Sequence, residues 1–525
     1  MASPRGSVLI VGGGHNALVS AAYLARAGVQ VTVLERNEHL GGAAVSERPF
    51  AGVDARLSRY SYLVSLLPQQ IIGDLRLPIR LLPRRVSSYS ADPAGGSGLL
   101  LGPSSVAESL DRIGAGADLT AWERLAAETD LLAERIFPTV LEPLPVRSEL
   151  RRRVGDDRLW AELIESPIGA VLAERFTSDL VAGTLFTDGL IGTFGGLDDP
   201  DLLTTCCFLY HVMGGPWRVP VGGMGAVSGA LADAARAAGA RLVTGADVTA
   251  ITPDGEVEWR DATGEHRDVA DLVLAGVAPA VLDELLAAGG AGASGGASGA
   301  SVAAEGAQVK VNVVLRRLPR LRDAAVRPED AFAGTLHVHE GMAELVGAHT
   351  EASAGRWPDP LPVEVYCHTL SDPSILSPEL AATGAHTLTL FGLQTPHRLT
   401  AGADPDALRA DLQRRALASL QDALGEDLEP LLLPDADGRP CIETRTTLDL
   451  ERELRLPGGS IFHGDLAWPF AEDAEELVTP AERWGVATSA PRVLLCGSGA
   501  RRGGAVSGIA GANAARAALE SLPGA

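Results

Sequence analysis

Residues 8–35 read VLIVGGGHNALVSAAYLARAGVQVTVLE, and this stretch decides the fold. The apolar run at 8–11 predicts a short strand, residues 17–27 predict a helix rich in alanine and leucine, and residues 29–34 predict a second strand. Gly28 marks the end of the helix. The stretch therefore predicts a β-α-β unit at the start of an α/β protein.

The turn inside this unit has the spacing G-x-G-x-x-A that dinucleotide-binding proteins use. Gly12 permits the tight turn, Gly14 lets the backbone approach a pyrophosphate, and the small Ala17 lets helix and strand pack closely. The positive end of the helix then faces the phosphates. Glu35 follows Gly14 by 21 residues, where a carboxylate can accept hydrogen bonds from ribose hydroxyls. The predicted site comprises Gly12, Gly13, Gly14, His15, Asn16, Ala17 and Glu35.

Two further glycine segments bear on which dinucleotide is bound. Gly41-Gly42-Ala43 follows Glu35-Arg36 by a short loop, and a second close backbone approach suits a cofactor that continues past its pyrophosphate. Residues 222–225 (GGMG) also precede a helix and could form a second nucleotide site, for NAD(P)H. However, Pro216 and Pro220 interrupt the preceding strand, so a role in shaping the first nucleotide domain is the preferred interpretation.

The C-terminal region has a third glycine-rich segment, LCGSGARRGG at 495–504, before a helix predicted to begin near Ser507. Such a segment lets main chain pass close to a flat ring, and the helix directs its positive end at charge beyond it. Reduced flavin develops negative charge at one edge of its ring. The segment therefore favours a flavin, and hence FAD, as the cofactor.

The composition excludes several classes of protein. The 525 residues carry a formal charge of −23, which argues against nucleic acid or an anionic membrane as the main partner. The five cysteines show no metal-binding or disulfide spacing, and the N-terminus shows no signal peptide, so we expect a cytoplasmic protein that touches a membrane at most from outside. His337 and His339 alternate on a predicted strand, but without further ligands we interpret them as ordinary strand positions rather than a metal site.

The pattern along the chain predicts an α/β protein with two domains. The first is an FAD-binding, Rossmann-like domain of three layers that includes a β-meander, and the second is a discontinuous α+β substrate domain. Between them we expect a flexible loop of Gly, Ala and Ser. From about residue 99 to residue 211 the pattern is helical and predicts an inserted body of helices, the clearest at 122–135 and 159–172. The run at 241–251 is predicted as one strand. The predicted boundaries are 1–90, 215–287 and 456–525 for the FAD domain, 91–214 and 305–455 for the substrate domain, and 288–304 for the loop.

These motifs together resemble the phytoene-dehydrogenase-related flavoproteins, in the branch that includes carotenoid ketolases and the pyridine nucleotide-disulphide oxidoreductase domain-containing type. The resemblance extends over nearly the whole chain, in order. It rests on residues 11–47, 216–236, 461–466 and 494–519.

The resemblance implies non-covalent FAD held by three separated stretches. Val248 would offer its backbone to the adenine. Residues from Gly497 to Gly508 would line the flavin, and Arg36, Gly41, Gly42 and Ala43 would contact the cofactor. Two departures stand out: residues 501–505 read RRGGA where relatives carry HPGGG, and Ala17 replaces a common glycine. The cofactor-contacting residues implied in the C-terminal segment are Gly497, Ser498, Gly504, Val506 and Ser507.

The leading functional hypothesis is hydride transfer from a substrate C–H bond to flavin, which creates a double bond in an apolar small molecule, with an isoprenoid as one candidate. Arg501 or Arg502 would stabilise the reduced ring by its charge. Oxidation of an amine or natural-product scaffold and a non-catalytic FAD-containing binding protein remain open. The sequence does not specify the electron acceptor, a general acid or base, or the oligomeric state.

Overall fold

The computed structural model describes residues 6–102, 104–290 and 304–522. The predicted flexible loop at 288–304 falls mostly outside these residues. Among the helices of the described segments, none combines the length and the apolar character that crossing a membrane requires.

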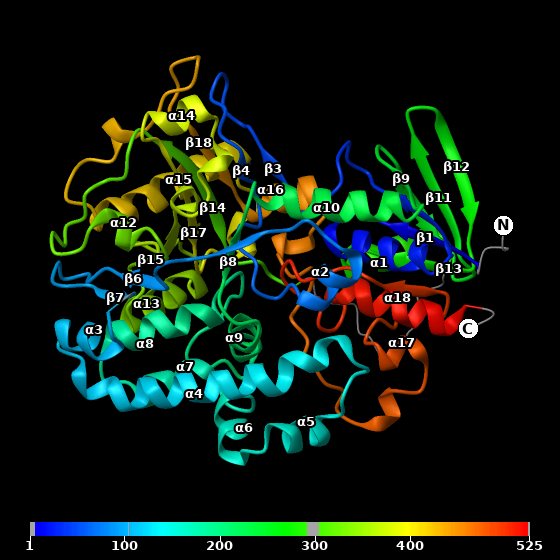
Figure 1. The fold of residues 1–525 in the computed structure, drawn as a ribbon, viewed down its shortest axis with the longest axis horizontal. Coiled ribbons are helices and arrows are strands. Elements are labelled where there is room, and N and C mark those ends of the chain that lie inside the picture. Colours follow the sequence, from blue (N-terminus) through cyan, green and yellow to red (C-terminus); the bar gives the residue numbers. More distant parts are fainter. Residues whose placement is uncertain (1–5, 103, 291–303, 523–525) are drawn as a thin grey trace.

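A five-stranded parallel sheet forms the first half of the molecule, at the right of Figure 1, where the N- and C-termini also lie. The predicted β-α-β unit lies at its centre as β1, helix α1 (His15–Arg26) and β2. The C-terminal strand β19 pairs with β13, which pairs with β1, so both ends of the chain belong to one sheet. The strand order is β19 (Val493–Leu495), β13 (Leu272–Ala275), β1 (Ser7–Val11), β2 (Gln30–Leu34) and β9 (Arg241–Val243).

The two faces of this sheet are covered differently, as the alternation of side chains in β1 requires. Val8 and Ile10 join the core beneath α1 and two further helices, α10 (Met224–Ala237) and α18 (Ile509–Ser521). Leu9 and Val11 join a separate core under an antiparallel meander and helix α11 (Pro279–Ala288). The predicted three-layer, Rossmann-like domain is confirmed, and its meander consists of β10 (Asp247–Ile251), β11 (Glu256–Asp261) and β12 (Gly264–Val269).

A seven-stranded sheet forms the other half, with helix α15 (Pro405–Asp422) against one face. Alternate residues of its strands, such as Val311, Val363 and Leu388, pack in one core with Leu412 and Leu420 of α15. The residues between them point to the opposite face. The strand order is β18 (Ile442–Arg445), β14 (Val309–Leu315), β17 (His386–Gly392), β16 (Val363–Tyr366), β15 (Thr335–Val338), β6 (Ser88–Ser90) and β7 (Leu99–Leu101).

A body of helices lies at the lower left and centre of Figure 1, below the seven-stranded sheet. The single helix predicted at 159–172 is wrong, because Pro167 lacks an N–H group and restricts Ser166, so the chain breaks into two helices there. The helices of this body are α3 (Val106–Arg112), α4 (Leu119–Ile136), α5 (Arg147–Val154), α6 (Asp157–Leu163), α7 (Ile168–Arg175), α8 (Asp179–Phe186) and α9 (Leu203–Met213).

The run at 241–251 is also two elements rather than the one strand predicted. The turn at 244–246 sends β9 into the parallel sheet and β10 into the meander. Apart from α13, the remaining α-helices and strands are short, and they connect these units. They are β3 (Ser46–Glu47), β4 (Leu57–Ser58), α2 (Gln69–Leu75), β5 (Leu81–Pro83), β8 (Arg218–Pro220), α12 (Pro328–Ala331), α13 (Met342–Ser353), α14 (Pro378–Ala382), α16 (Thr447–Leu454) and α17 (Pro480–Arg483).

Candidate active site

The glycine turn between β1 and α1 leaves an open space at the start of the helix. Gly12 has a φ of 93°, and its N–H donates to Leu34 O at 2.8 Å, which fixes the turn against β2. Gly14 caps α1 without any side-chain hydrogen bond, and a Cβ atom built there meets nothing within 4 Å. The N–H groups at the start of α1 therefore face space in which an anion fits.

Glu35 braces this turn from the end of β2. Its carboxylate is buried and accepts hydrogen bonds from Gly13 N at 2.6 Å and from Asn37 N at 2.8 Å. The acid predicted to bind a ribose thus also holds the glycine turn in shape. Its remaining oxygen lone pairs are the ones that a ligand hydroxyl could use.

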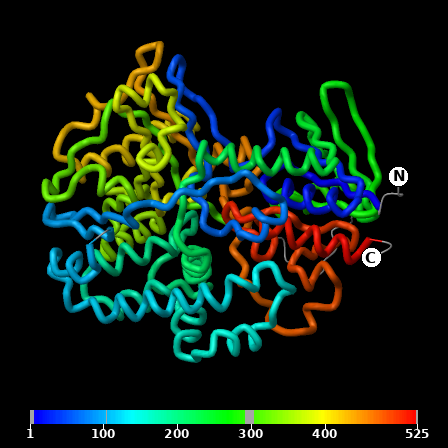
Figure 2. The backbone as a smooth tube through the Cα atoms, viewed as in Figure 1, coloured from blue at the N-terminus to red at the C-terminus, as the bar shows by residue number. Residues whose placement is uncertain are grey.

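The first and last glycine segments meet at α1. Asn16 Nδ2 donates to Ser498 Oγ at 3.3 Å and to Gly503 O at 3.4 Å. His15 Nε2 lies 3.1 Å from Ala505 O, so the neutral ring carries its proton on Nε2, and burial lowers the pKa of His15 to about 4. Figure 2 shows the C-terminal helix beside the N-terminal segment, in agreement with the packing of α18 on α1.

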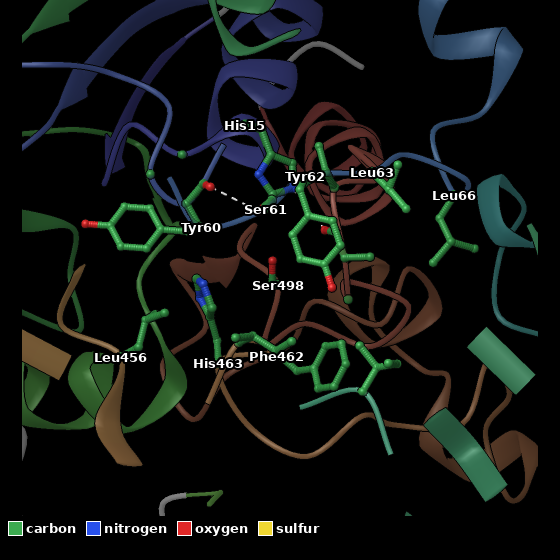
Figure 3. A pocket seen from close by; sticks show the side chains of 18 of the residues that line it. His15, Tyr60, Ser61, Tyr62, Leu63, Leu66, Leu456, Phe462, His463 and Ser498 are labelled. Atoms are coloured by element: carbon green, nitrogen blue, oxygen red, sulfur yellow. Dashed lines mark hydrogen bonds between the residues drawn. The ribbon is translucent and has the colours of Figure 1, made fainter. Parts of the chain in front are cut away.

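A cavity of about 580 Å³ extends from this turn into the space between the two sheets and the helical body. Figure 3 shows part of its wall, with His15, Ser498 and His463 directed toward one another around the same space. Most of the residues predicted as cofactor contacts line it: Gly12, Gly13, Gly14, His15, Asn16, Ala17, Glu35, Arg36, Gly42, Ala43, Val248, Gly497, Ser498, Gly504 and Val506.

Two predicted contacts, Gly41 and Ser507, support the wall from behind. Gly41 has a φ of 121°, donates to Gly13 O at 2.8 Å and leaves no room for a Cβ atom, which would lie 2.8 Å from Ser228 Oγ. Ser507 Oγ accepts from Ile509 N at the start of α18. Both residues therefore shape backbone that the cavity touches without lining the cavity themselves.

The structure corrects the role predicted for Arg501 and Arg502, because neither lines the cavity. Arg501 donates to Phe470 O at 2.6 Å and points toward Glu476, while its side chain stays partly exposed. Arg502 is fully buried and donates to the carbonyl oxygens of Thr139, Glu142 and Trp484. Their charges hold loops together and do not face the cavity.

The far end of the cavity contains functional groups that the sequence analysis missed. They come from the second sheet, from the helical body and from the connecting segments that contain Tyr62 and Arg84. For the residues on strands, the signal that could have found them is alternation. Val309, Val311 and Val313 of β14 face α15, so Lys310 must face the other way. The polar residues at this end are Tyr62, Arg84, Asp188, His211, Lys310, His337, Glu364 and Tyr366.

Lys310 is held tightly in this wall. Its ammonium donates to Ser58 O at 2.6 Å and to Tyr60 O at 2.8 Å, and Nζ lies 4.8 Å from the centre of the Tyr62 ring. Burial lowers the pKa of Lys310 to about 7.

The two histidines near the end of β15 have different environments. His337 lines the cavity, and its Nδ1 contacts Glu340 Oε2. His339 follows the strand with a φ of 56°, turns away, and contacts Glu344 and Asp422 at 2.8 and 3.0 Å. The strand position predicted for His337 is confirmed, and its side chain also belongs to a buried polar cluster, whereas the prediction is wrong for His339, which follows the last residue of β15.

The glycine segment at 222–225 does not form a second nucleotide site. Its helix, α10, begins with N–H groups that the protein itself satisfies: Met224 N donates to Ser58 Oγ and Gly225 N to Ser46 Oγ. Gly222 N donates to Asp372 Oδ2 at 2.6 Å. With these donors occupied, the segment links the two halves of the molecule, and its role in shaping the first nucleotide domain stays a prediction.

Comparisons with known proteins agree with this geometry. Residues 10–69 match the family described as NAD(P)-binding Rossmann-like domain. An uncharacterized protein of Mycobacterium tuberculosis is 50% identical over 98% of this chain and 97% of its own length. Pyridine nucleotide-disulfide oxidoreductase domain-containing protein 2 of Rattus norvegicus is 30% identical over 99% of this chain and 94% of its own length.

The chain belongs to the family of pyridine nucleotide-disulfide oxidoreductase domain-containing protein 2. Solved structures of other proteins are similar to this chain in fold. An oxidoreductase from Methanosarcina mazei has a TM-score of 0.57 at 14% identity, over 98% of this chain and 100% of its own. Cyclohexylamine oxidase from Brevibacterium oxydans has a TM-score of 0.54 at 15% identity, over 98% of both chains. The chain shares its fold with these two proteins.

Membership of this family supports an enzyme. The similarity to the Rattus norvegicus relative extends over 99% of this chain, so it includes both halves of the molecule. The match to the Rossmann-like family ends at residue 69, before the second sheet begins. Apart from Tyr62, the polar residues at the far end of the cavity therefore lie in the part of the chain that this match does not reach.

Proposed function

We propose that the protein is an FAD-dependent oxidoreductase that removes a hydride from a carbon of a largely apolar small molecule. The observation that carries the proposal is the open space at Gly14, which faces the uncapped start of α1 and continues into the cavity as far as the C-terminal glycine segment. Two buried polar atoms there, Asn16 Oδ1 and His463 Nδ1, have no hydrogen-bond partner in the described chain. A polar ligand that enters this space would satisfy them.

The residues present fit FAD along its length. Glu35 would take the ribose, the backbone of 12–17 the pyrophosphate, and Val248 the adenine side. Gly497, Ser498 and residues 504–506 would line the ring, next to the start of α18, whose positive end favours negative charge. When bound, FAD supplies a two-electron acceptor for a hydride.

The protein's own part in the reaction is to bind, orient and exclude water. Leu66, Trp122, Leu185 and Ile191 give the substrate side of the cavity an apolar wall. His15 and His463 stay neutral at pH 7, because burial lowers the pKa of each to about 4. They add hydrogen-bonding groups to the site without adding charge.

Two substrate classes from the sequence analysis differ in what they require of the cavity. Desaturation of a hydrocarbon such as an isoprenoid, as in the phytoene-dehydrogenase-like branch, requires an apolar tunnel. Oxidation of an amine or a natural-product scaffold requires a polar anchor. The ionisable groups at the far end, Arg84, Asp188, His337 and Glu364, favour the second class as an alternative to the hydrocarbon.

The test begins with the visible spectrum and the FAD content of the purified protein, followed by anaerobic addition of small molecules. We expect flavin absorbance with about one FAD per chain, and bleaching by the substrate. A protein that neither carries nor binds FAD would disprove the proposal. FAD that no compound in a broad amine, alcohol and isoprenoid panel bleaches would instead support a non-catalytic FAD-binding role.

A further inference from the structure

Three acid groups lie close together at the far end of the cavity, while the Lys310 ammonium at this end donates to Ser58 O and Tyr60 O instead. Asp188, between α8 and α9, and Glu364 of β16 line the wall, and Glu340 lies behind His337. The exposed fractions of Glu340 and Glu364 are 2% and 1%. Buried carboxylates of this kind require a compensating cation or a proton.

Nearby groups compensate this charge only in part. Tyr366 donates its hydroxyl to Glu364 Oε2, and His211 Nε2 lies 3.3 Å from Asp188 Oδ1. The Arg84 guanidinium donates to Trp217 O at 3.3 Å and to Thr335 Oγ1 at 2.8 Å, rather than to a carboxylate of the described chain. The Arg84 charge therefore acts on Glu364 and Asp188 through space, without a hydrogen bond to either carboxylate.

One atom of the cluster has no partner at all. Glu340 Oε1 is fully buried and accepts no hydrogen bond within the described residues. Burial lowers the pKa of His337 and of His211, so both rings are neutral near pH 7. Burial, and then the charge of Glu340, raise the pKa of Glu364 to about 8, and burial also raises the pKa of Glu340 well above its usual value.

We propose that this acidic end binds the ammonium group of an apolar amine, with Glu364 and Asp188 in direct contact and Glu340 behind them. The proposal names the substrate class of the oxidation inferred above and rests on it. An ammonium group supplies three N–H donors and the missing positive charge. The apolar chain of the amine would lie against Leu185 and Ile191, which line the same cavity.

Two other ligands have chemistry that parts of this cluster could accept. The ligand atoms of His337, Glu340 and Glu364 lie within 4.8 Å of one another, a spacing that a divalent metal ion could bridge. Arg84 could instead receive a carboxylate. Lys310 is held by two backbone carbonyl groups, so Arg84 is the cation whose charge Glu364 and Asp188 share. This balance of charge, and the position of Glu340 behind the cavity wall, favour the ammonium group.

The experiment measures binding by calorimetry to the purified protein, with and without saturating FAD. The probes are octylamine, octan-1-ol, octanoate, ZnCl₂ and MnCl₂ at pH 7.5. We expect octylamine to bind at least tenfold more tightly than octan-1-ol or octanoate. Glu364→Gln should remove that preference and leave the affinity for octan-1-ol unchanged. Glu265→Gln, on the exposed edge of the meander, makes the same charge change and should have no effect.

The pH dependence gives an independent readout. The titratable groups near Glu364 are Tyr62, Arg84, Asp188, Cys207, His337, Glu340 and Tyr366. Octylamine stays protonated below about pH 10. Its affinity should therefore rise from pH 6 to pH 9 as Glu364 ionises, and Glu364→Gln should flatten this rise.

Several results would overturn the proposal: equal or tighter binding of octanoate, no preference for octylamine over octan-1-ol, or stoichiometric metal binding that excludes octylamine. If Glu364→Gln does not fold, as judged by circular dichroism, Asp188→Asn takes its place with the same expected loss. Absence of FAD binding would remove the oxidation but not the amine preference, so the two proposals fail separately.

Discussion

Asn16 at the start of α1 donates a hydrogen bond to Ser498 Oγ at 3.3 Å, although 482 residues separate the two in the chain. A second bond from the same amide reaches Gly503 O. Both residues are buried, and both line the cavity. Through this contact the first strand-turn-helix unit and the last glycine segment form one wall.

The first prediction concerns this contact. Asn16→Ala leaves the buried Ser498 hydroxyl and Gly503 carbonyl without that donor, so the free energy of unfolding should fall by about 1–3 kcal/mol. Urea denaturation measures this loss. Ser498→Ala removes only the acceptor and should cost less. Equal stability of Asn16→Ala and wild type would show that water replaces the amide without cost.

The second prediction separates cofactor binding from folding at the glycine turn. Gly14 has an ordinary φ of −68° and open space at its Cβ position, so Gly14→Ala should leave the melting temperature unchanged. The added methyl group enters the space where the cofactor would pass, so the affinity for FAD should fall at least tenfold.

Gly12 and Gly229 are the matched controls for this substitution. Gly12 has a φ of 93°, so Gly12→Ala should cost about 1 kcal/mol or more in stability. Gly229 is exposed on α10 with open space at its Cβ position, so Gly229→Ala should affect neither property adversely. Unchanged FAD affinity in Gly14→Ala would contradict the placement of the pyrophosphate.

The third prediction is a pH dependence of stability. Burial lowers the folded-state pKa of His15 to about 4 from 6.5, so below pH 6.5 the unfolded chain binds a proton that the folded one does not. This contribution to stability is present above pH 6.5 and is lost as the pH falls toward 4. Between pH 7 and pH 5 it should amount to about 1–2 kcal/mol.

The measurement compares wild type with His15→Asn in urea at pH 7 and pH 5. Asparagine cannot titrate, so the variant should lose less stability than wild type over this interval. The two proteins share every other titrating group. Parallel losses in both would mean that His15 takes up a proton in the folded state as readily as in the unfolded chain.

The fourth prediction contrasts two neighbouring arginines. Arg502→Met leaves the buried carbonyl groups of Thr139, Glu142 and Trp484 without their donor, and should destabilise the protein by about 3 kcal/mol. Arg501→Ala removes a partly exposed side chain, and should change stability by less than about 1 kcal/mol. Thermal denaturation and FAD titration of both variants test this. A loss of FAD affinity in Arg501→Ala with unchanged stability would restore the role first predicted for it.

Much of the nucleotide domain could be predicted because its signals are local. The strand, glycine turn and helix of residues 7–26 follow one another directly, and the function of Gly12 depends on the backbone at that position. The helix predicted at 159–172 was wrong because the prediction followed the helical spacing of apolar residues and did not take account of Pro167. Arg501 was predicted to face the flavin because it lies in the C-terminal glycine segment. The direction of its side chain depends instead on Phe470 and Glu476, which belong to a different loop.

The sequence by itself determined the β-α-β unit, its glycine turn and the acid at the end of β2, because each depends on backbone geometry over a few residues. Only the tertiary structure decided that Asn16 meets Ser498, and that Arg84, Asp188, His337 and Glu364 share the end of one cavity. The latter come from four separate segments, and alternation along a strand tells which residues share a face without telling what that face opposes. The pairing of strands and the packing of the helical body supply that information, and they depend on contacts between residues far apart in the chain.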